Sequence, residues 1–255
     1  MKIGALAAAA KVAFLFLLAQ SLAAQSAEVK LLSGGGFMSV MNEIAPQFER
    51  TSGHKLVSSF ESTGALRRQI NAGESFDVVL IGAELIEELV KAGKVAPGTR
   101  VDVARAGLGV AVRADAPKPD IGSVDAFKRA LVNAKTVSYL GEGTGGARFV
   151  ALLDNFGIAE QMKPKLRPLE IANVVKVVAS GEVELVVDLI TRILAERGVE
   201  LVGPLPGEIQ SYSGFSAALS AAPKEPEAAK SLMQFLKSDA AAPVIKAKGM
   251  ETAAP

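Results

Sequence analysis

The sequence predicts an α/β protein in which parallel strands alternate with helices. Three observations lead to this class. Segments of strand length are followed repeatedly by segments with helical periodicity. The segment 78–81 is apolar at every position, as expected of a strand buried on both faces of a parallel sheet. Glycine-rich turns at 34–36 and 141–146 join a strand to a helix in each half of the chain.

The first half of the chain predicts three strand–helix units. The strands are expected at 29–32, 55–60 and 78–81, and the helices at 38–50, from Gly64 through Ile70, and at 84–92. This order predicts a parallel sheet with right-handed crossovers.

The second half continues the alternation after an interruption at Pro117 and Pro119. Ser123 is placed as the N-cap of a helix that runs through Leu131. The other strands are expected at 108–112, 136–140, 185–189 and 215–220, and the other helices through 148–153, at 173–180 and at 225–237.

The N-terminus has the features of a cleaved secretory signal peptide. Lys2 and Lys11 give a positive charge, 12–19 is apolar, and 21–24 consists mainly of small residues. The apolar run is shorter than the roughly 20 residues that a membrane-spanning helix needs. We therefore expect residues 1–23 to be removed near Ala23 and the mature protein to be exported to the periplasm. Since no cysteine precedes the mature region, attachment of a lipid to cysteine is excluded.

The composition excludes several classes of site. The chain has 28 Lys and Arg against 27 Asp and Glu, a balance that argues against a nucleic-acid-binding protein. Without cysteine it has no disulfide, thiol nucleophile or Cys-ligated metal. His54 is the single histidine, which excludes a multi-histidine metal site. We expect no metal and no cofactor.

The glycine-rich turns point to an anion site. The first turn of a helix has unpaired backbone N–H groups and a positive partial charge, and glycine lets a ligand approach that backbone. The turns at 34–36, 62–64 and 141–146 together predict two lobes whose helix ends face a shared cleft. The alternative is that the glycines serve only to make tight turns.

Several segments carry a resemblance to a known family. They are VKLLS (29–33), IAPQFE (44–49), STGALRRQINAG (62–73), FDVVL (76–80), VKVVASGE (175–182), AAKSLMQFLK (228–237) and KAKGM (246–250). In this order the chain resembles the periplasmic molybdate-binding proteins and related type II solute-binding proteins of ABC transporters. The resemblance extends over nearly the whole mature chain.

The resemblance implies a two-lobed type II periplasmic binding protein fold with two strands crossing at a hinge. Lobe 1 would comprise 28–109 and 213–255, and lobe 2 would comprise 110–212. In such a Venus-flytrap protein the ligand closes the lobes, and a permease in the inner membrane recognises the closed form. A clamshell of this kind works as one unit, so we expect a monomer.

The resemblance also implies a set of residues that contact a small anionic ligand. These residues are Ser33, Gly34, Gly35, Gly36, Phe37, Ser62, Thr63, Thr144, Gly145, Gly146, Arg148, Asn173, Val174, Asp188 and Arg192. No catalytic residue is assigned, and transport is favoured over enzymatic activity.

This chain departs from the molybdate-binding pattern in ways that favour a larger ligand. The tyrosine that the family has near residue 189 is absent, and glycines occupy 34–36 where the family usually has alanines and a serine. Arg148 and Arg192 suit a carboxylate, which a guanidinium can bind through two parallel hydrogen bonds. We therefore favour an organic carboxylate over a molybdate-type oxyanion. The alternatives are a surface position for either arginine or an ion pair: Arg148 with Asp154, and Arg192 with Asp188 or Glu196.

An enzyme remains the alternative function. The segments 100–103, 116–121 and 125–128 also resemble aconitate isomerase, which acts on a tricarboxylate. Such a reaction needs a base, and Glu61, Glu142 and Asp188 are the candidates. Hydrolysis by a serine nucleophile is weaker, because its base could only be His54. A binding module that serves a sensor cannot be separated from a transport protein on sequence.

Overall fold

The computed structural model describes residues 26–253. The predicted signal peptide, residues 1–23, lies outside the described residues. Across 26–253, no helix combines the length and the apolar character needed to cross a membrane.

The described chain alternates strands and helices, which confirms the α/β prediction. The strands are β1 (Glu28–Gly34), β2 (Lys55–Glu61), β3 (Val78–Ile81), β4 (Val101–Arg113), β5 (Val137–Leu140), β6 (Leu166–Leu169), β7 (Leu185–Leu189), β8 (Val199–Pro204), β9 (Tyr212–Leu219) and β10 (Met250–Thr252). The helices are α2 (Met38–Ser52), α3 (Thr63–Asn71), α4 (Ala83–Lys91), α5 (Val124–Asn133), α6 (Thr144–Asn155), α7 (Ala159–Met162), α8 (Lys176–Ala179), α9 (Ile190–Ala195), α10 (Pro226–Leu236) and α11 (Ala242–Ala247), with 3-10 turns η1 (Gly35–Phe37), η2 (Lys163–Lys165) and η3 (Gly207–Ile209).

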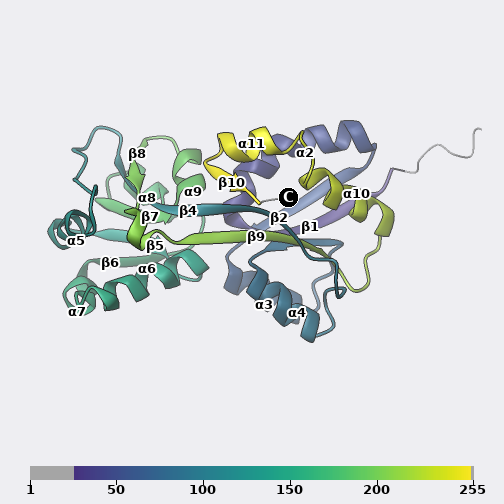
Figure 1. Cartoon of the computed structure of the whole chain (residues 1–255), viewed down its shortest axis with the longest axis horizontal. Helices are drawn as coiled ribbons and strands as arrows, with labels where there is room; N and C mark the ends of the chain where they lie inside the picture. The colour runs from purple at the N-terminus through teal and green to yellow at the C-terminus, as the bar shows by residue number, and fades with distance from the viewer. Residues whose placement is uncertain (1–25, 254–255) are drawn as a thin grey trace, which may run out of the picture.

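Two groups of strands form the two lobes (Figure 1). In the first lobe, β1 pairs in parallel with β2 and β3, and β3 continues antiparallel to β9. In the second lobe, β5 pairs in parallel with β6 and β7. The parallel pairs are those that the strand–helix alternation predicts, because parallel neighbours need a crossover connection.

The strands β4 and β9 connect the lobes (Figure 1). β4 pairs with β9 over Val101–Gly107 and then with β7 over Leu108–Val112, so a single strand belongs to both sheets. The C-terminal strand β10 pairs with β4 at Ala104–Ala106, beside this change of partner.

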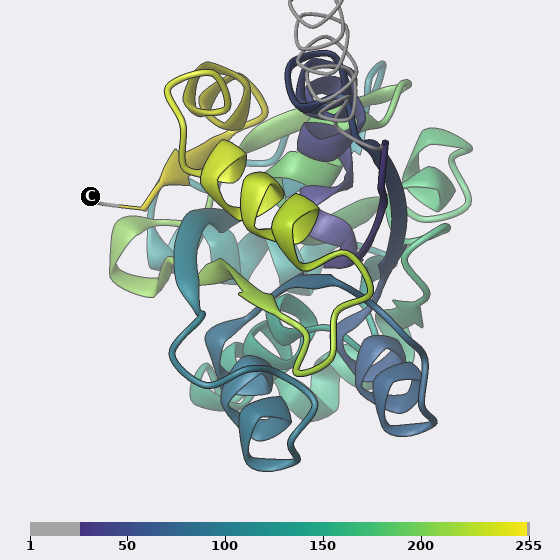
Figure 2. The ribbon, with the colours of Figure 1, turned by 90° about the vertical axis from the view of Figure 1, so that its right-hand side faces the viewer.

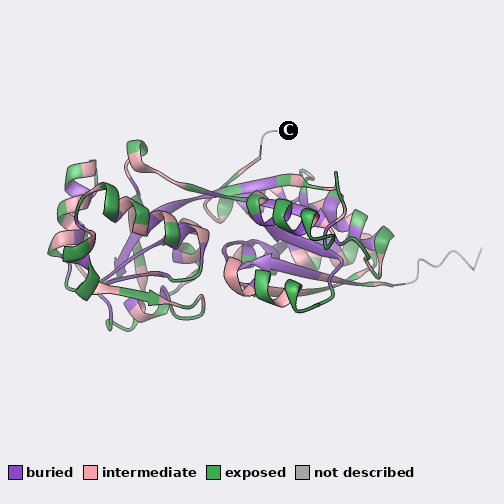
Figure 3. Cartoon of the chain, turned by 90° about the horizontal axis from the view of Figure 1, so that it is seen from below, coloured by how far each residue is buried: buried purple, intermediate pink, exposed green. Residues whose placement is uncertain are grey.

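Helices cover both faces of the first sheet, with α2, α10 and α11 on one side and α3 and α4 on the other (Figures 1 and 2). The long helix α2 buries Val40, Met41, Ile44 and Phe48, which recur at helical spacing, and it ends at Gly53 with a left-handed φ of 74°. The central strands of both lobes are largely buried, whereas the edge strands β2 and β6 and the outer faces of the helices carry the more exposed residues (Figure 3).

Some predicted elements differ from the structure. The expected helix at 173–180 is a series of turns followed by the short α8. The expected strand at 108–112 is the second part of the 13-residue β4. The short elements β6, β8, β10, α9 and α11 were not predicted, because segments of three to six residues carry little periodicity.

Candidate functional site

A cavity of about 50 Å³ lies between the two lobes. It is lined by Gly34, Gly35, Gly36, Glu61, Ser62, Thr63, Ile81, Gly82, Glu84, Leu140, Gly143, Thr144, Gly145, Arg148, Leu189, Arg192, Ser213, Gly214 and Phe215. Segments that are far apart in the sequence therefore meet at one place.

Four helix N-termini point their first turns at this cavity. Ser62 caps α3, and its Oγ accepts a hydrogen bond from the backbone N–H of Ala65 at 3.2 Å. The other three starts, at η1–α2, α4 and α6, are capped by Gly34, Gly82 and Gly143, which offer no side-chain acceptor. Backbone N–H groups of the first turns are therefore available to an anion, and the helix dipoles favour negative charge there.

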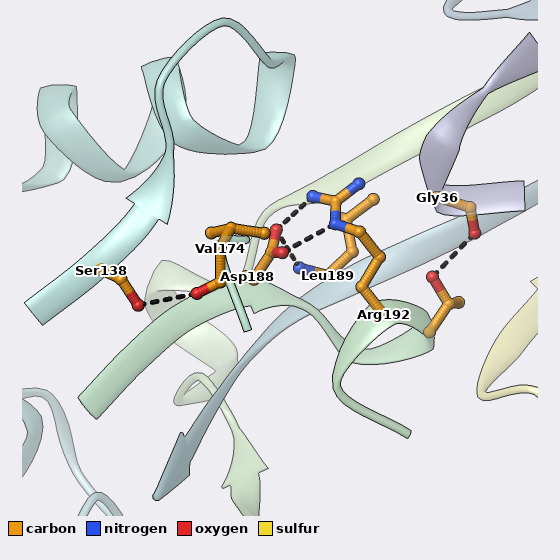
Figure 4. A network of polar contacts seen from close by, with 7 residues as sticks. Gly36, Ser138, Val174, Asp188, Leu189 and Arg192 are labelled. Atoms are coloured by element: carbon orange, nitrogen blue, oxygen red, sulfur yellow. Dashed lines mark hydrogen bonds and ion pairs between the residues drawn. The ribbon is translucent and has the colours of Figure 1, made fainter. Parts of the chain in front are cut away.

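Arg192 reaches the cavity from α9 and is held by Asp188 (Figure 4). Its Nε donates to Asp188 Oδ2 at 2.7 Å and its Nη2 donates to Oδ1. Oδ1 also accepts a hydrogen bond from the backbone N–H of Leu189 at 2.8 Å. The side chains of Arg192 and Asp188 are 9% and 1% exposed, so this is a buried ion pair.

The remaining nitrogen of this guanidinium faces the first lobe. A Cβ built on Gly36 would lie 3.5 Å from Arg192 Nη1. Because Asp188 fixes the other two nitrogens, Nη1 is presented in one orientation at the wall of the cavity.

Arg148, on α6, has a different environment. Its Nη1 donates to Ser211 Oγ at 3.3 Å and to the carbonyl of Tyr212, at the start of the connecting strand β9. Both partners are neutral, and within residues 26–253 Arg148 forms no ion pair with a carboxylate. Its positive charge is therefore available to an anionic ligand.

The cavity is not purely basic, because Glu61 and Glu84 also line it. Together with Asp188, which lies behind Arg192, they give three carboxylates and two guanidinium groups at or next to the cavity. The charge of a bound anion would therefore be balanced by Arg148 and the helix N-termini more than by a net positive charge on the side chains.

The glycines at the cavity allow close packing of the protein against itself. A Cβ on Gly35 would lie 1.6 Å from Ile171 Cδ1, and one on Gly36 would lie 2.7 Å from both Leu189 and Phe215. None of the three residues 34–36 has a positive φ. Gly35 and Gly36 therefore do not enlarge the space for a ligand, because neighbouring side chains occupy the positions that their Cβ atoms would take.

Comparisons with known proteins place the chain in a family. Residues 29–251 match the family described as bacterial extracellular solute-binding protein. The chain belongs to this family. It is 34% identical to an aconitate isomerase from Pseudomonas sp. over 226 residues, covering 87% of this chain and 86% of the relative. It is 32% identical to a molybdate-binding protein from Azotobacter vinelandii over 237 residues, covering 89% and 91%.

A solved structure of the periplasmic molybdate-binding protein of Azotobacter vinelandii superimposes with a TM-score of 0.75 at 20% identity. The superposition covers 89% of this chain and 99% of that structure. The predicted type II periplasmic binding protein fold, with two lobes and two connecting strands, is therefore confirmed.

The structure of this solute-binding protein brings part of the predicted site together. The predicted residues that line the cavity are Gly34, Gly35, Gly36, Ser62, Thr63, Thr144, Gly145, Arg148 and Arg192. Their contact with a ligand stays a prediction.

The other predicted site residues do not line this cavity. Ser33 Oγ bonds to the carbonyl of Gly34, and Phe37 packs against Phe215 with ring centroids 5.5 Å apart. A Cβ on Gly146 would lie 1.8 Å from the carbonyl oxygen of Leu140, so this glycine allows α6 to pack closely against the end of β5.

Asn173, Val174 and Asp188 are likewise set back from the cavity. Asn173 and Val174 belong to the turns before α8, and the Val174 carbonyl accepts a hydrogen bond from Ser138 Oγ at 2.8 Å (Figure 4). Asp188 acts on the cavity through Arg192, as the ion-pair alternative predicted. For Arg148, the alternative partner Asp154 is not bonded; Ser211 and Tyr212 are.

Sequence reasoning missed several lining residues. Gly82 starts the fourth helix at the cavity, and its position after a buried apolar strand is the same signal that identified the other turns. The connecting strand β9 contributes Ser213, Gly214 and Phe215. No local sequence pattern indicates that this strand passes beside the cavity. Glu84 was overlooked because it is a first-turn acid of a type common in any helix.

Proposed function

We propose that this protein captures a small organic carboxylate between its lobes and delivers it to an ABC permease in the inner membrane. The observation that carries the proposal is the position of Arg148 and Arg192. Both come from the second lobe, while three of the four helix N-termini come from the first lobe. A carboxylate that meets both sets of donors would hold the lobes together.

Contacts between the lobes support a closed arrangement. Thr191 Oγ1 donates to the carbonyl of Gly36 at 2.8 Å. At the cleft surface, Arg68 Nη2 bonds to the Glu142 carboxylate at 2.8 Å, and the Gly64 N–H donates to the Glu142 carbonyl at 3.4 Å. A ligand that favours this arrangement would present one defined surface to a permease, because a ligand shifts an equilibrium by its differential affinity for the two states.

The size of the cavity limits what it can enclose. Its volume of about 50 Å³ is well below the roughly 150 Å³ of an engineered cavity that binds benzene. One carboxylate group or one tetrahedral oxyanion is of suitable size. A guanidinium favours the planar carboxylate, with which it forms two parallel hydrogen bonds.

The test is a thermal-shift and calorimetric screen of the purified mature protein against di- and tricarboxylates, monocarboxylates, molybdate, tungstate, sulfate and phosphate. A ligand at about a hundred times its Kd adds roughly 2.7 kcal/mol of stability. We expect a carboxylate to raise the melting temperature and Arg148→Ala to abolish the effect. Arg167→Ala, on the exposed β6 of the same lobe, is the matched control. A response to molybdate or tungstate alone would refute the carboxylate assignment.

A second candidate function is isomerisation of a tricarboxylate. It is favoured by the 34% identity to an aconitate isomerase together with the position of Glu61 at the cavity wall. Of the three candidate bases, Asp188 is bonded to Arg192 and Glu142 to Arg68, whereas Glu61 has no hydrogen-bonded side-chain partner among residues 26–253. Glu61 could remove a proton from a carbon next to a carboxylate and return it elsewhere on the substrate.

This candidate is tested by following the conversion of cis-aconitate to trans-aconitate by chromatography. Glu61→Gln should abolish turnover while retaining binding, and Glu84→Gln is the control at the same cavity. No turnover by the wild-type protein would eliminate the isomerase.

A further inference from the structure

A second, larger space adjoins the cavity on the cleft side. Its volume is about 820 Å³. Glu61, Ser62 and Leu140 line both spaces, so the two share a wall. We call the smaller one the inner cavity and the larger one the outer space.

Ile171 stands at the boundary between them. It belongs to the second lobe and lines the outer space, while its Cδ1 lies over Gly35, which lines the inner cavity. Any side chain at residue 35 would collide with it, since a Cβ there would be 1.6 Å away. Through this contact, one side chain of the second lobe closes the inner cavity against the first lobe.

The walls of the outer space combine apolar and charged side chains. Its large apolar side chains are those of Phe60, Leu140, Pro168, Leu169 and Ile171. This surface suits the burial of an apolar group, which gains roughly 25 cal/mol for each Å² removed from water.

The charged groups around the outer space disfavour a second carboxylate. Arg68 and Glu142 neutralise each other in an ion pair of 2.8 Å. Glu61 and Glu170 also line the space, and neither forms an ion pair in the part of the chain that the structure describes. A further negative charge would meet two carboxylates and no free cation in these walls.

We propose that the ligand is a carboxylic acid with one carboxylate in the inner cavity and an uncharged apolar body in the outer space. Ile171 is then the residue that sets how wide the link between head and body can be. This inference rests on the proposed carboxylate function and specifies its substrate class. It favours monocarboxylates with an aliphatic or aromatic body over citrate-like acids.

The test measures Kd by calorimetry for acetate, phenylacetate, citrate and molybdate. Three variants accompany the wild type: Ala65→Leu, which fills the outer space from α3; Ile171→Ala, which widens the link; and Val177→Ala. Val177 packs against the same hydrophobic cluster as Ile171 but lines neither space, so it is the matched control.

We expect the wild type to bind phenylacetate more tightly than acetate or citrate. Ala65→Leu should raise the Kd for phenylacetate about tenfold or more, because the apolar body of the ligand loses its site. The Kd for acetate should change by less than about twofold. Ile171→Ala should change the ratio of the phenylacetate and acetate affinities, and Val177→Ala should leave it unchanged. If Ala65→Leu does not fold, Ala172→Leu fills the same space from an exposed position.

Three results would overturn the inference. If Ala65→Leu weakens the binding of acetate and of phenylacetate equally, the outer space does not hold the body of the ligand, while the proposed carboxylate function still stands. Tighter binding of citrate than of phenylacetate would reject the apolar body and favour the tricarboxylate isomerase. Binding of molybdate alone would refute both the inference and the proposed function.

Discussion

The buried pair of Asp188 and Arg192 gives a direct test of how the cavity is built. Replacing Asp188 by Ala leaves the Arg192 guanidinium without its partner at a site where the side chain is 9% exposed. It also removes the acceptor of the Leu189 N–H. Breaking a buried pair by removing one partner typically costs 3–5 kcal/mol. Because Arg192 also borders the cavity, where water can reach it, we expect about 3 kcal/mol for Asp188→Ala.

Removing the charges of both Asp188 and Arg192 should lower the free energy of unfolding much less than removing Asp188 alone. In Asp188→Leu/Arg192→Met the charged groups are replaced by apolar side chains, so no buried charge is left alone. We expect the free energy of unfolding of this double variant to lie within about 1 kcal/mol of the wild type. Asp188→Asn, which keeps an acceptor for the Leu189 N–H, should lose about 1–2 kcal/mol.

Urea denaturation, followed by circular dichroism, provides the free energies of unfolding. The matched control is Glu227→Ala on α10, which removes the exposed pair with Lys230 and should change stability by less than about 0.5 kcal/mol. The reasoning is refuted if Asp188→Ala costs no more than Glu227→Ala. It is also refuted if the double variant is less stable than Asp188→Ala.

Three further predictions concern packing, capping and pH. Gly146→Ala should destabilise the protein by about 1–3 kcal/mol, because its Cβ would lie 1.8 Å from the backbone oxygen of Leu140; Gly207→Ala, with nothing within 4 Å of the new atom, should be nearly neutral in the same denaturation assay. Ser123→Ala should cost about 1 kcal/mol by removing the 3.2 Å hydrogen bond to the Ala126 N–H, without altering ligand affinity measured by calorimetry; a change in affinity would contradict a purely local cap. Burial raises the pKa of the Tyr139 hydroxyl above its usual value, so the unfolded chain ionises first and stability is lost as pH rises above about 10. Tyr139→Phe should lose less stability between pH 9 and 11 than the wild type, and equal losses would show that Tyr139 does not contribute.

The elements that the sequence predicted are those with a clear local pattern of apolar residues. The segment 78–81 forms a strand where expected because it is apolar at every position, and α2 appears because its buried residues repeat at the helical period. The glycine turns at 34–36 and 143–145 do place helix starts at one cavity. These features depend on neighbouring residues, which a single sequence displays.

The features that the sequence did not predict depend on distant contacts. That Gly35 makes room for Ile171, and Gly36 for Leu189 and Phe215, requires knowing which segments meet. The same holds for Arg148, whose partners lie more than sixty residues along the chain, at and just before the start of the connecting strand β9. Asp188 was included as a ligand contact because residue type alone does not distinguish a group at a cavity wall from one behind it.

The route of the chain through its two lobes has a consequence for folding during synthesis. The second lobe is formed by one continuous stretch between β4 and β9, whereas the first lobe also needs β9 and β10 from the C-terminal end. Its central strand β3 has no partner on the β9 side until residues 216–219 have been made. Pairings of such large sequence separation form slowly, because the loop between them must close first. Thus the first lobe of the nascent chain should remain incompletely folded until translation is nearly finished.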